Sequence, residues 1–362
     1  MTAAASTVLA SAETALGARD YQAAIDLLVD GGPALRGDIR AELRAQLDES
    51  WARMSIGDLD SAVLRLERAR ALAEAPVCDD TDRAEVLYQF GCCRLKSGAV
   101  SNAVQLLTVA LRLSEDSPTP SDRLRIDILC WRTRCYRRQR DWDSARADAD
   151  AAIQLGEELN EPARLADAYS QASQIAARTG QLLMARFYIE RAIELLRHAG
   201  NLLAAGKALN NLGGILFLLG ETDAAKSRLT EAFAVALELG NKVDAAYAVS
   251  STAQVLLRGG EALSAEQQAR YALELLEGRA DHVNEVGNAK LVLGRALMEL
   301  GRFDESAHEL AAADESFEQM NSLGHRAAAW LAQGDLAARR GRIEDAATVY
   351  RRAAEALQDV RF

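Results

Sequence analysis

The sequence predicts an all-α fold, a solenoid built from about nine antiparallel helix pairs. Only five of the 362 residues are Pro, and the abundant Ala, Leu, Glu and Arg favour helices. A Gly followed five residues later by Ala recurs about every 40 residues along the chain. Self-similarity at a fixed period is typical of repeat proteins, in which each unit packs on its neighbours.

The Gly-to-Ala spacing marks the expected turn inside each helix pair. It occurs at Gly57/Ala62, Gly98/Ala103, Gly180/Ala185, Gly220/Ala225, Gly260/Ala265 and Gly341/Ala346. Arg19 and Arg140 replace the Gly before Ala24 and Ala145, and Ser306 replaces the Ala after Gly301. From Ala24 the steps are 38, 41, 42, 40, 40, 40, 41 and 40 residues. Because Gly adopts left-handed backbone angles at little cost, we expect one helix to end there and the chain to reverse.

Small residues also mark where the helices should pack. A second Ala follows seven residues after the first, which is two helical turns, at Ala69, Ala110, Ala152, Ala192, Ala232, Ala272, Ala313 and Ala353. Leu66, Leu107, Ile189, Leu229 and Leu310 lie between the small residues on the same stripe. Seven residues before the turn, another Gly recurs at Gly91, Gly213, Gly294 and Gly334. A mid-helix Gly costs about 1 kcal/mol relative to Ala, so we predict that these glycines mark close helix crossings.

The period divides the chain into repeats with no separate domain. We expect a single solenoid over residues 1–362, with repeats at approximately 4–36, 37–78, 79–118, 119–160, 161–200, 201–240, 241–280, 281–321 and 322–362. The first repeat begins within the first ten residues and the ninth reaches the last residue, so we expect no helix-turn-helix domain beside the repeats.

Composition and motifs exclude several classes of function. A net charge of −11 argues against broad binding to nucleic acids or acidic membranes. The N-terminal segment carries Glu13 where a signal peptide is apolar, and no apolar run reaches 18 residues, so we expect a cytoplasmic protein. Only five of the 42 basic residues are Lys, which favours a GC-rich bacterial source. The five cysteines fit reduced core thiols better than a metal site or disulfides. We expect no cofactor, no metal and no catalytic residue.

Two runs carry a family resemblance. The segments ALNNLGGILFLLGETDAAKSRLTEAFAVALELGN (208–241) and GRALMELGRFDESAHELAAADESF (294–317) resemble tetratricopeptide repeats. The resemblance extends over nearly the whole chain and is weaker in the first two repeats. The usual unit has 34 residues, whereas this one has about 40, similar to maltose-regulator-type repeats, kinesin light chains and quorum-sensing peptide receptors. The resemblance implies a right-handed superhelix whose first helices line a concave groove.

The sharpest site candidates are Asn210 and Asn211. In peptide-binding relatives an Asn near this place bonds the backbone of an extended ligand, and an amide offers both donors and an acceptor. The alternative is a pair of solvated Asn on a helix face. We also assign to the groove other polar residues of the first helices: Lys207, Gln171, Gln174, Ser250 and Ser251.

Cations suggest the chemistry of the partner. A column stands two residues before the turns, at Lys96, Arg138, Arg178, Arg258 and Arg339. It could hold an acidic peptide or a carboxylate, or it could only complement the C-terminal helix dipoles. A basic run at residues 131–142 includes Arg132, Arg134 and Arg137. It could bind an acidic partner, although neutralisation by Asp141, Asp143, Asp148 and Asp150 on the following helix is the stronger interpretation.

These observations predict a non-catalytic scaffold or adaptor that holds a protein or peptide segment in its groove. The partner would carry acidic or carboxylate groups, and neither nucleic acid nor membrane would be bound directly. The chain would be a monomer, or alternatively a homodimer formed through its end faces. The alternative function is a ligand- or peptide-sensing regulator that acts on transcription or on a partner enzyme without its own DNA-binding domain.

Overall fold

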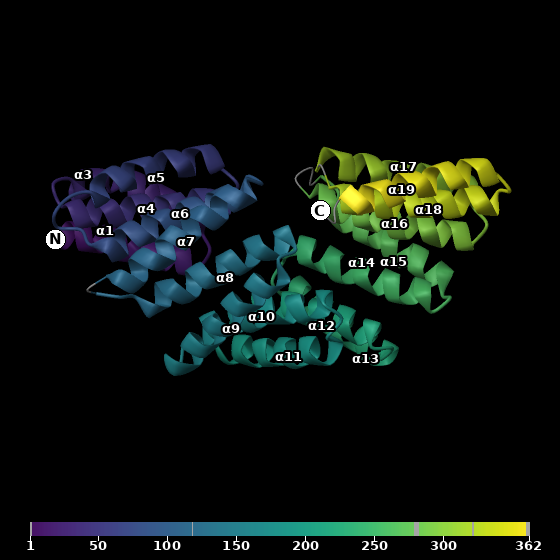
Figure 1. Ribbon diagram of the computed structural model, residues 1–362, viewed down its shortest axis with the longest axis horizontal. Helices are drawn as coiled ribbons and strands as arrows, with labels where there is room; N and C mark the ends of the chain where they lie inside the picture. The colour runs from purple at the N-terminus through teal and green to yellow at the C-terminus, as the bar shows by residue number, and fades with distance from the viewer. Residues whose placement is uncertain (1, 118, 279–281, 321, 360–362) are drawn as a thin grey trace. The chain divides into compact units, whose positions relative to one another are not determined.

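Helices account for all regular secondary structure in the computed structural model, which describes residues 2–117, 119–278, 282–320 and 322–359. Over these ranges there are nineteen helices and no strand (Figure 1). The prediction of an all-α solenoid is confirmed. The helices are α1 (Ala3–Gly17), α2 (Tyr21–Asp30), α3 (Gly32–Leu35), α4 (Ile39–Ser55), α5 (Leu59–Ala73), α6 (Asp80–Lys96), α7 (Val100–Asp116), α8 (Asp122–Gln139), α9 (Trp142–Glu158), α10 (Pro162–Arg178), α11 (Leu182–His198), α12 (Leu202–Leu218), α13 (Thr222–Glu238), α14 (Lys242–Arg258), α15 (Ala262–Leu275), α16 (Val283–Glu299), α17 (Phe303–Gln319), α18 (Leu323–Arg339) and α19 (Ile343–Asp359).

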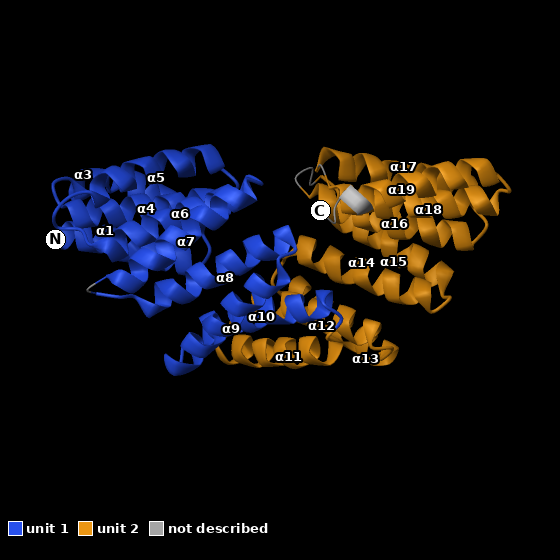
Figure 2. Cartoon of the chain, viewed as in Figure 1, with its two compact units in different colours: residues 1–180 blue, residues 181–362 orange. Residues whose placement is uncertain are grey.

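The chain divides into two compact units, residues 1–180 and 181–362 (Figure 2). In the first unit, α4, α6, α8 and α10 each contact the next of these first helices, and the second helices α5, α7 and α9 each pack between two of them. The second unit repeats this arrangement with first helices α12, α14, α16 and α18 and second helices α13, α15 and α17. The first helices therefore form a continuous face within each unit.

The predicted turn is present at the end of each first helix. The backbone φ angle is positive at Gly57, Gly98, Gly180, Gly220, Gly260, Gly301 and Gly341. Arg19 and Arg140, which replace Gly in the pattern, also adopt left-handed angles, with φ of 62° and 60°. Glu221 N donates to Leu216 O at 2.9 Å, which closes the end of α12 and reverses the chain.

The stripe of small residues is the packing face of the second helices, as predicted. The first and second small residues of the pattern are buried from the second repeat onward, and the Leu or Ile between them is fully buried in Leu66, Leu107, Ile189, Leu229 and Leu310. Ser306 keeps its place in this stripe because its hydroxyl donates to Gly294 O at 2.7 Å. A buried hydroxyl satisfied in this way avoids a large desolvation cost.

The mid-helix glycines mark close crossings between the two helices of a pair. An added Cβ at Gly213 would lie 2.6 Å from Cδ2 of Leu229, and one at Gly294 would lie 2.7 Å from Cδ2 of Leu310. Gly91 faces Leu107 in the same way, and Gly334 faces Tyr350. No real Cβ approaches a carbon so closely, so the helix backbone itself serves as the contact surface for the buried Leu.

The five cysteines belong to the buried core. All five cysteines are free and buried, and burial raises the pKa of the Cys93 and Cys135 thiols to about 11. They behave as small apolar core residues.

Over the described residues, no helix combines the length and apolar character needed to cross a membrane.

The close crossing can be tested with two adjacent glycines in α12. Gly213→Ala should lower the free energy of unfolding by about 1–3 kcal/mol, because the new methyl group must displace Leu229. Gly214→Ala should raise it by about 0.5–1 kcal/mol, because nothing lies within 4 Å of the added Cβ and Ala favours the helix. Urea denaturation measures both. A Gly213→Ala protein as stable as the Gly214→Ala protein would contradict the predicted crossing.

Candidate functional site

A polar pocket of 310 Å³ opens on the second unit where α12, α13, α14 and α16 meet. Its polar lining comes from first helices: Lys207, Asn210 and Asn211 of α12, Asp244 and Tyr247 of α14, and Asn284 and Glu285 of α16. Its apolar lining comes from Leu203 and Gly206 of α12 and from Ala232, Val235 and Ala236 of α13. The volume lies at the small end of the range for ligand pockets, which suits one or two residues of a peptide.

Asn210 is the residue in this pocket whose hydrogen bonding is incomplete. The residue is only 8% exposed, and its side-chain Oδ1 is buried without a hydrogen-bond partner among the described residues. A buried acceptor left unpaired costs about 1–3 kcal/mol. An N–H donor that entered the pocket would remove this cost. Asn211, the next residue, is half-buried and lines the same pocket.

Asn caps position the charged residues of the pocket. Asn201 Oδ1 accepts from Ala204 N at 3.3 Å and starts α12, and Asn241 Oδ1 accepts from Asp244 N at 3.0 Å and starts α14. Lys207 Nζ then lies 3.6 Å from Asp244 Oδ2, with the Lys207 side chain 59% exposed. Asp244 Oδ2 also accepts from Asn241 Nδ2 at 2.8 Å. An ion pair with so exposed a lysine is weak, so the Lys207 ammonium remains available to a ligand.

Small residues form the base of the pocket. An added Cβ at Gly206 would lie 3.1 Å from Cγ1 of Val235 on α13. With Ala232 and Ala236 on the facing helix, the absence of larger side chains leaves this space open. The same small residues that let the helices approach therefore also shape the pocket.

The other predicted residues of the second unit lie outside the pocket lining. Ser250 is buried and its Oγ has no hydrogen-bond partner among the described residues, while Ser251 is half-buried. Arg258 lies over the Phe217 ring, with its guanidinium carbon 5.3 Å from the ring centroid. This stacking on the preceding first helix gives Arg258 a structural role.

In the first unit, two arginines of the basic run are neutralised inside the protein. Arg132 forms a bidentate pair with Asp148 on α9, at 2.7 Å for both bonds. This pair agrees with the expected neutralisation by the following helix. Arg134 instead donates to both oxygens of Asp167 at 2.7 Å, and Asp167 lies on the next first helix, α10. The partner predicted for Arg134 was therefore on the wrong helix.

The cation column joins consecutive first helices. Lys96 Nζ donates to Met54 O at 3.1 Å, and Arg138 Nη1 donates to Leu95 O at 3.0 Å. Each carbonyl belongs to the last turn of the preceding first helix and also accepts from the turn glycine, from Gly57 N at 3.3 Å and from Gly98 N at 3.2 Å. Arg339 Nη2 pairs with Glu299, the last residue of α16, at 2.5 Å. These three cations bond to the end of the preceding first helix, a contact that neither interpretation of the column from the sequence had included.

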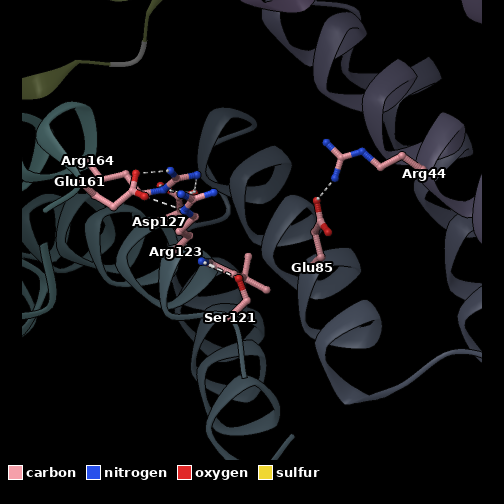
Figure 3. Close-up of polar contacts among 8 residues, drawn as sticks. Arg44, Glu85, Ser121, Arg123, Asp127, Glu161 and Arg164 are labelled. Carbon is pink, nitrogen blue, oxygen red and sulfur yellow. Dashed lines mark hydrogen bonds and ion pairs between the residues drawn. The ribbon is translucent and has the colours of Figure 1, made fainter. Parts of the chain in front are cut away.

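Ion pairs also cover the N-terminal halves of the first helices in this unit (Figure 3). Arg44 of α4 reaches Glu85 of α6 at 3.2 Å, and Arg164 of α10 reaches Asp127 of α8 at 3.0 Å. Arg123 of α8 binds Glu161 at 2.6 Å. Burial raises the pKa of Glu85 and of Asp127. The charged side chains named here are therefore paired with one another. In the second unit, by contrast, polar side chains line a pocket.

The predicted residues thus separate into two groups, one in each unit. Lys207, Asn210 and Asn211 line one pocket, and Gln171, Gln174 and Arg134 contact one another or Arg137 and Asp167 in the first unit. Sequence reasoning missed Asp244, Tyr247, Asn284 and Glu285. Tyr247 lies 13 residues before the turn residue Gly260, and Lys207 lies 13 residues before the turn residue Gly220. Steps of three residues back from Asn210 along this register would have found Tyr247, Asp244 and Glu285, but not Asn284.

The pair of Arg132 and Asp148 yields a stability test. Asp148→Ala should lower the free energy of unfolding by about 3–5 kcal/mol, because Arg132, whose side chain is 13% exposed, would be left buried without its carboxylate. The double substitution Arg132→Met with Asp148→Leu should recover most of this loss, since two apolar residues need no partner. Urea denaturation of the three proteins checks the cycle. A single variant that loses less than about 1 kcal/mol would show that the pair is not structural.

Comparison with known proteins identifies the repeat. Tetratricopeptide-repeat family models match residues 166–195 and 291–360. No curated protein matches the sequence. A Rap protein complexed with competence and sporulation factor has a similar structure, with a TM-score of 0.74, 15% identity and coverage of 99% of this chain and 98% of that chain.

Two further solved structures share the fold over nearly their whole length. The apo form of RapI has a TM-score of 0.72 at 12% identity, with coverage of 99% of this chain and 98% of that chain. The apo form of the quorum sensor NprR from B. thuringiensis has a TM-score of 0.69 at 12% identity, with coverage of 97% and 98%. With the two family matches and the helix pairs described above, the chain contains tetratricopeptide repeats.

Proposed function

We propose that this protein is a non-catalytic peptide-binding protein, and that its first helices hold an extended segment of a partner. The observation that carries the proposal is the buried Asn210 Oδ1, which has no partner among the described residues and belongs to the pocket lining. A backbone N–H of an extended peptide would supply the missing donor. Asn211 and Asn284 line the same pocket and would add further amide contacts.

The charges of the pocket suit a peptide better than a purely apolar ligand. Lys207 supplies a cation, and Asp244 and Glu285 supply carboxylates, all on first helices. Apolar surface from Leu203, Val235 and the two alanines can receive a small side chain. Since the helices are packed against one another, the pocket is largely preformed and little ordering cost falls on the protein.

The structural neighbours support this class of ligand. One Rap protein was crystallised with competence and sporulation factor, and NprR is a quorum sensor. As part of the proposal, the protein acts by binding, in the cytoplasm of a bacterium. It works as a monomer or as a homodimer formed through its end faces, with acidic or carboxylate groups on the partner.

A selection from a random hexapeptide library tests the pocket. Peptides retained by the wild-type chain should bind the double variant Asn210→Ala, Asn211→Ala at least about five-fold more weakly, because two amide contacts of about 0.5–1.5 kcal/mol each are removed. Fluorescence anisotropy measures the affinity, and the melting temperature should not fall, because Asn210→Ala removes the unpaired buried acceptor.

Gln254→Ala is the matched control. Gln254 is an exposed amide on α14 outside the pocket lining, so its loss should leave peptide affinity unaltered. Equal affinity of the double variant and the wild type would remove Asn210 and Asn211 from the site. It would move peptide binding to the second helices or to the ends of the array.

A further inference from the structure

A second polar site lies in the first unit, where the C-terminal halves of α8 and α10 are side by side. Arg137 of α8 donates through Nη1 to Gln171 Oε1 at 2.6 Å and through Nη2 to Gln174 Oε1. Both acceptors are neutral amides on α10. A guanidinium has five N–H donors, and these two bonds are its only ones within the described residues.

The one carboxylate of this site is already paired. Asp167 accepts from Arg134 Nη2 through both oxygens at 2.7 Å, and Gln171 Nε2 donates to Asp167 Oδ1 at 3.1 Å. The contacts form a chain from Arg134 through Asp167 and Gln171 to Arg137. Arg134 and Asp167 cancel in charge, so the charge of Arg137 has no counterpart.

Further cations surround Arg137. Arg138 uses its guanidinium to bond the main-chain oxygen of Leu95, which carries no net charge. Arg178 is exposed at the end of α10. Burial, followed by the charges of Arg134 and Arg178, lowers the pKa of Arg137 to about 10. Three guanidinium groups therefore lie together without a carboxylate of their own.

Other arginines on this face of the unit are paired with carboxylates. Arg44 pairs with Glu85, and Arg164 pairs with Asp127 and Glu161 (Figure 3). Arg44 also pairs with Asp48. In a chain with a net charge of −11, an arginine cluster without carboxylates is the exception. A half-buried guanidinium with open donors is suited to a planar oxyanion, which it binds by charge-assisted hydrogen bonds.

We propose that Arg137, flanked by Arg138 and Arg178, is the binding site for a carboxylate of a peptide ligand. The proposal rests on the peptide-binding function and specifies the chemistry of its partner. The carboxylate would come either from an acidic side chain or from the C-terminus of the peptide. Gln171 and Gln174 hold the guanidinium in place, since each accepts one of its N–H groups.

The experiment measures the peptide preference of the full chain. Four hexapeptide libraries are compared, with and without Asp and Glu, and each with a free or an amidated C-terminus. Wild type should retain carboxylate-bearing peptides at least about ten-fold better than neutral amidated ones. Preference for Asp or Glu identifies a side-chain carboxylate, and preference for the free C-terminus identifies the terminal one.

Three variants assign the preference to Arg137. Arg137→Gln should abolish it, and Arg137→Lys should keep part of it, because the charge remains but the bidentate geometry is lost. Arg123→Gln is the control, since Arg123 lies on the same helix with its side chain 69% exposed and paired with Glu161. Circular dichroism melting confirms that the variants are folded. A preference unchanged in Arg137→Gln, or no preference in wild type, would overturn the proposal.

The outcomes separate this site from the Asn210 pocket. Loss of all peptide binding in the Asn210/Asn211 variant, with no carboxylate preference in wild type, would support the pocket and reject the Arg137 site. A preference that depends on Arg137 and survives the Asn substitutions would support the Arg137 site and reject the pocket. Failure of every library to bind wild type would contradict both.

Discussion

The contact on which this protein depends is the packing of a leucine on a bare helix backbone. At Gly213, the absence of a Cβ lets Leu229 reach the main chain of the first helix, and the same contact recurs at Gly91 and Gly294. Each such residue costs about 1 kcal/mol of helix propensity. The close approach offsets this cost with many dispersion contacts around a fully buried side chain. This contact joins the pairs α6/α7, α12/α13 and α16/α17, and Gly334 makes the corresponding contact with Tyr350 in α18/α19.

The second helices pack against one side of each first helix. The opposite side of the first helix can therefore carry polar groups. The two units use that freedom differently. In the first unit, arginines and carboxylates pair across neighbouring first helices, as Arg164 does with Asp127. In the second unit, the corresponding face carries amides and a pocket whose base is formed by small residues such as Gly206. Binding function can therefore vary along the array without disturbing the core.

The period of the sequence was sufficient to predict the helix pairs, the turns and the buried stripe, including the left-handed Arg140. These features depend on backbone geometry, which the spacing of Gly and Ala reports directly. The same spacing places Asn210 and Asn211 on a first helix, whereas their role in ligand binding was suggested by the family resemblance and stays a prediction. The partners of Arg134 and Arg138 could not, because they depend on how long side chains reach between repeats. The open donors of Arg137 follow from those contacts, so only the structure distinguishes Arg137 from its paired neighbours.

Hydrogen–deuterium exchange of the full chain, with and without a peptide selected from the hexapeptide library, tests most directly whether ligands bind to first helices. If the pocket is the binding site, bound peptide should slow exchange in residues 202–218, 242–258 and 283–299, which are the first helices that line it. The second helices α15 and α17 should change little. Slower exchange confined to those second helices would contradict the account, because it would place the ligand on the packing side of the array.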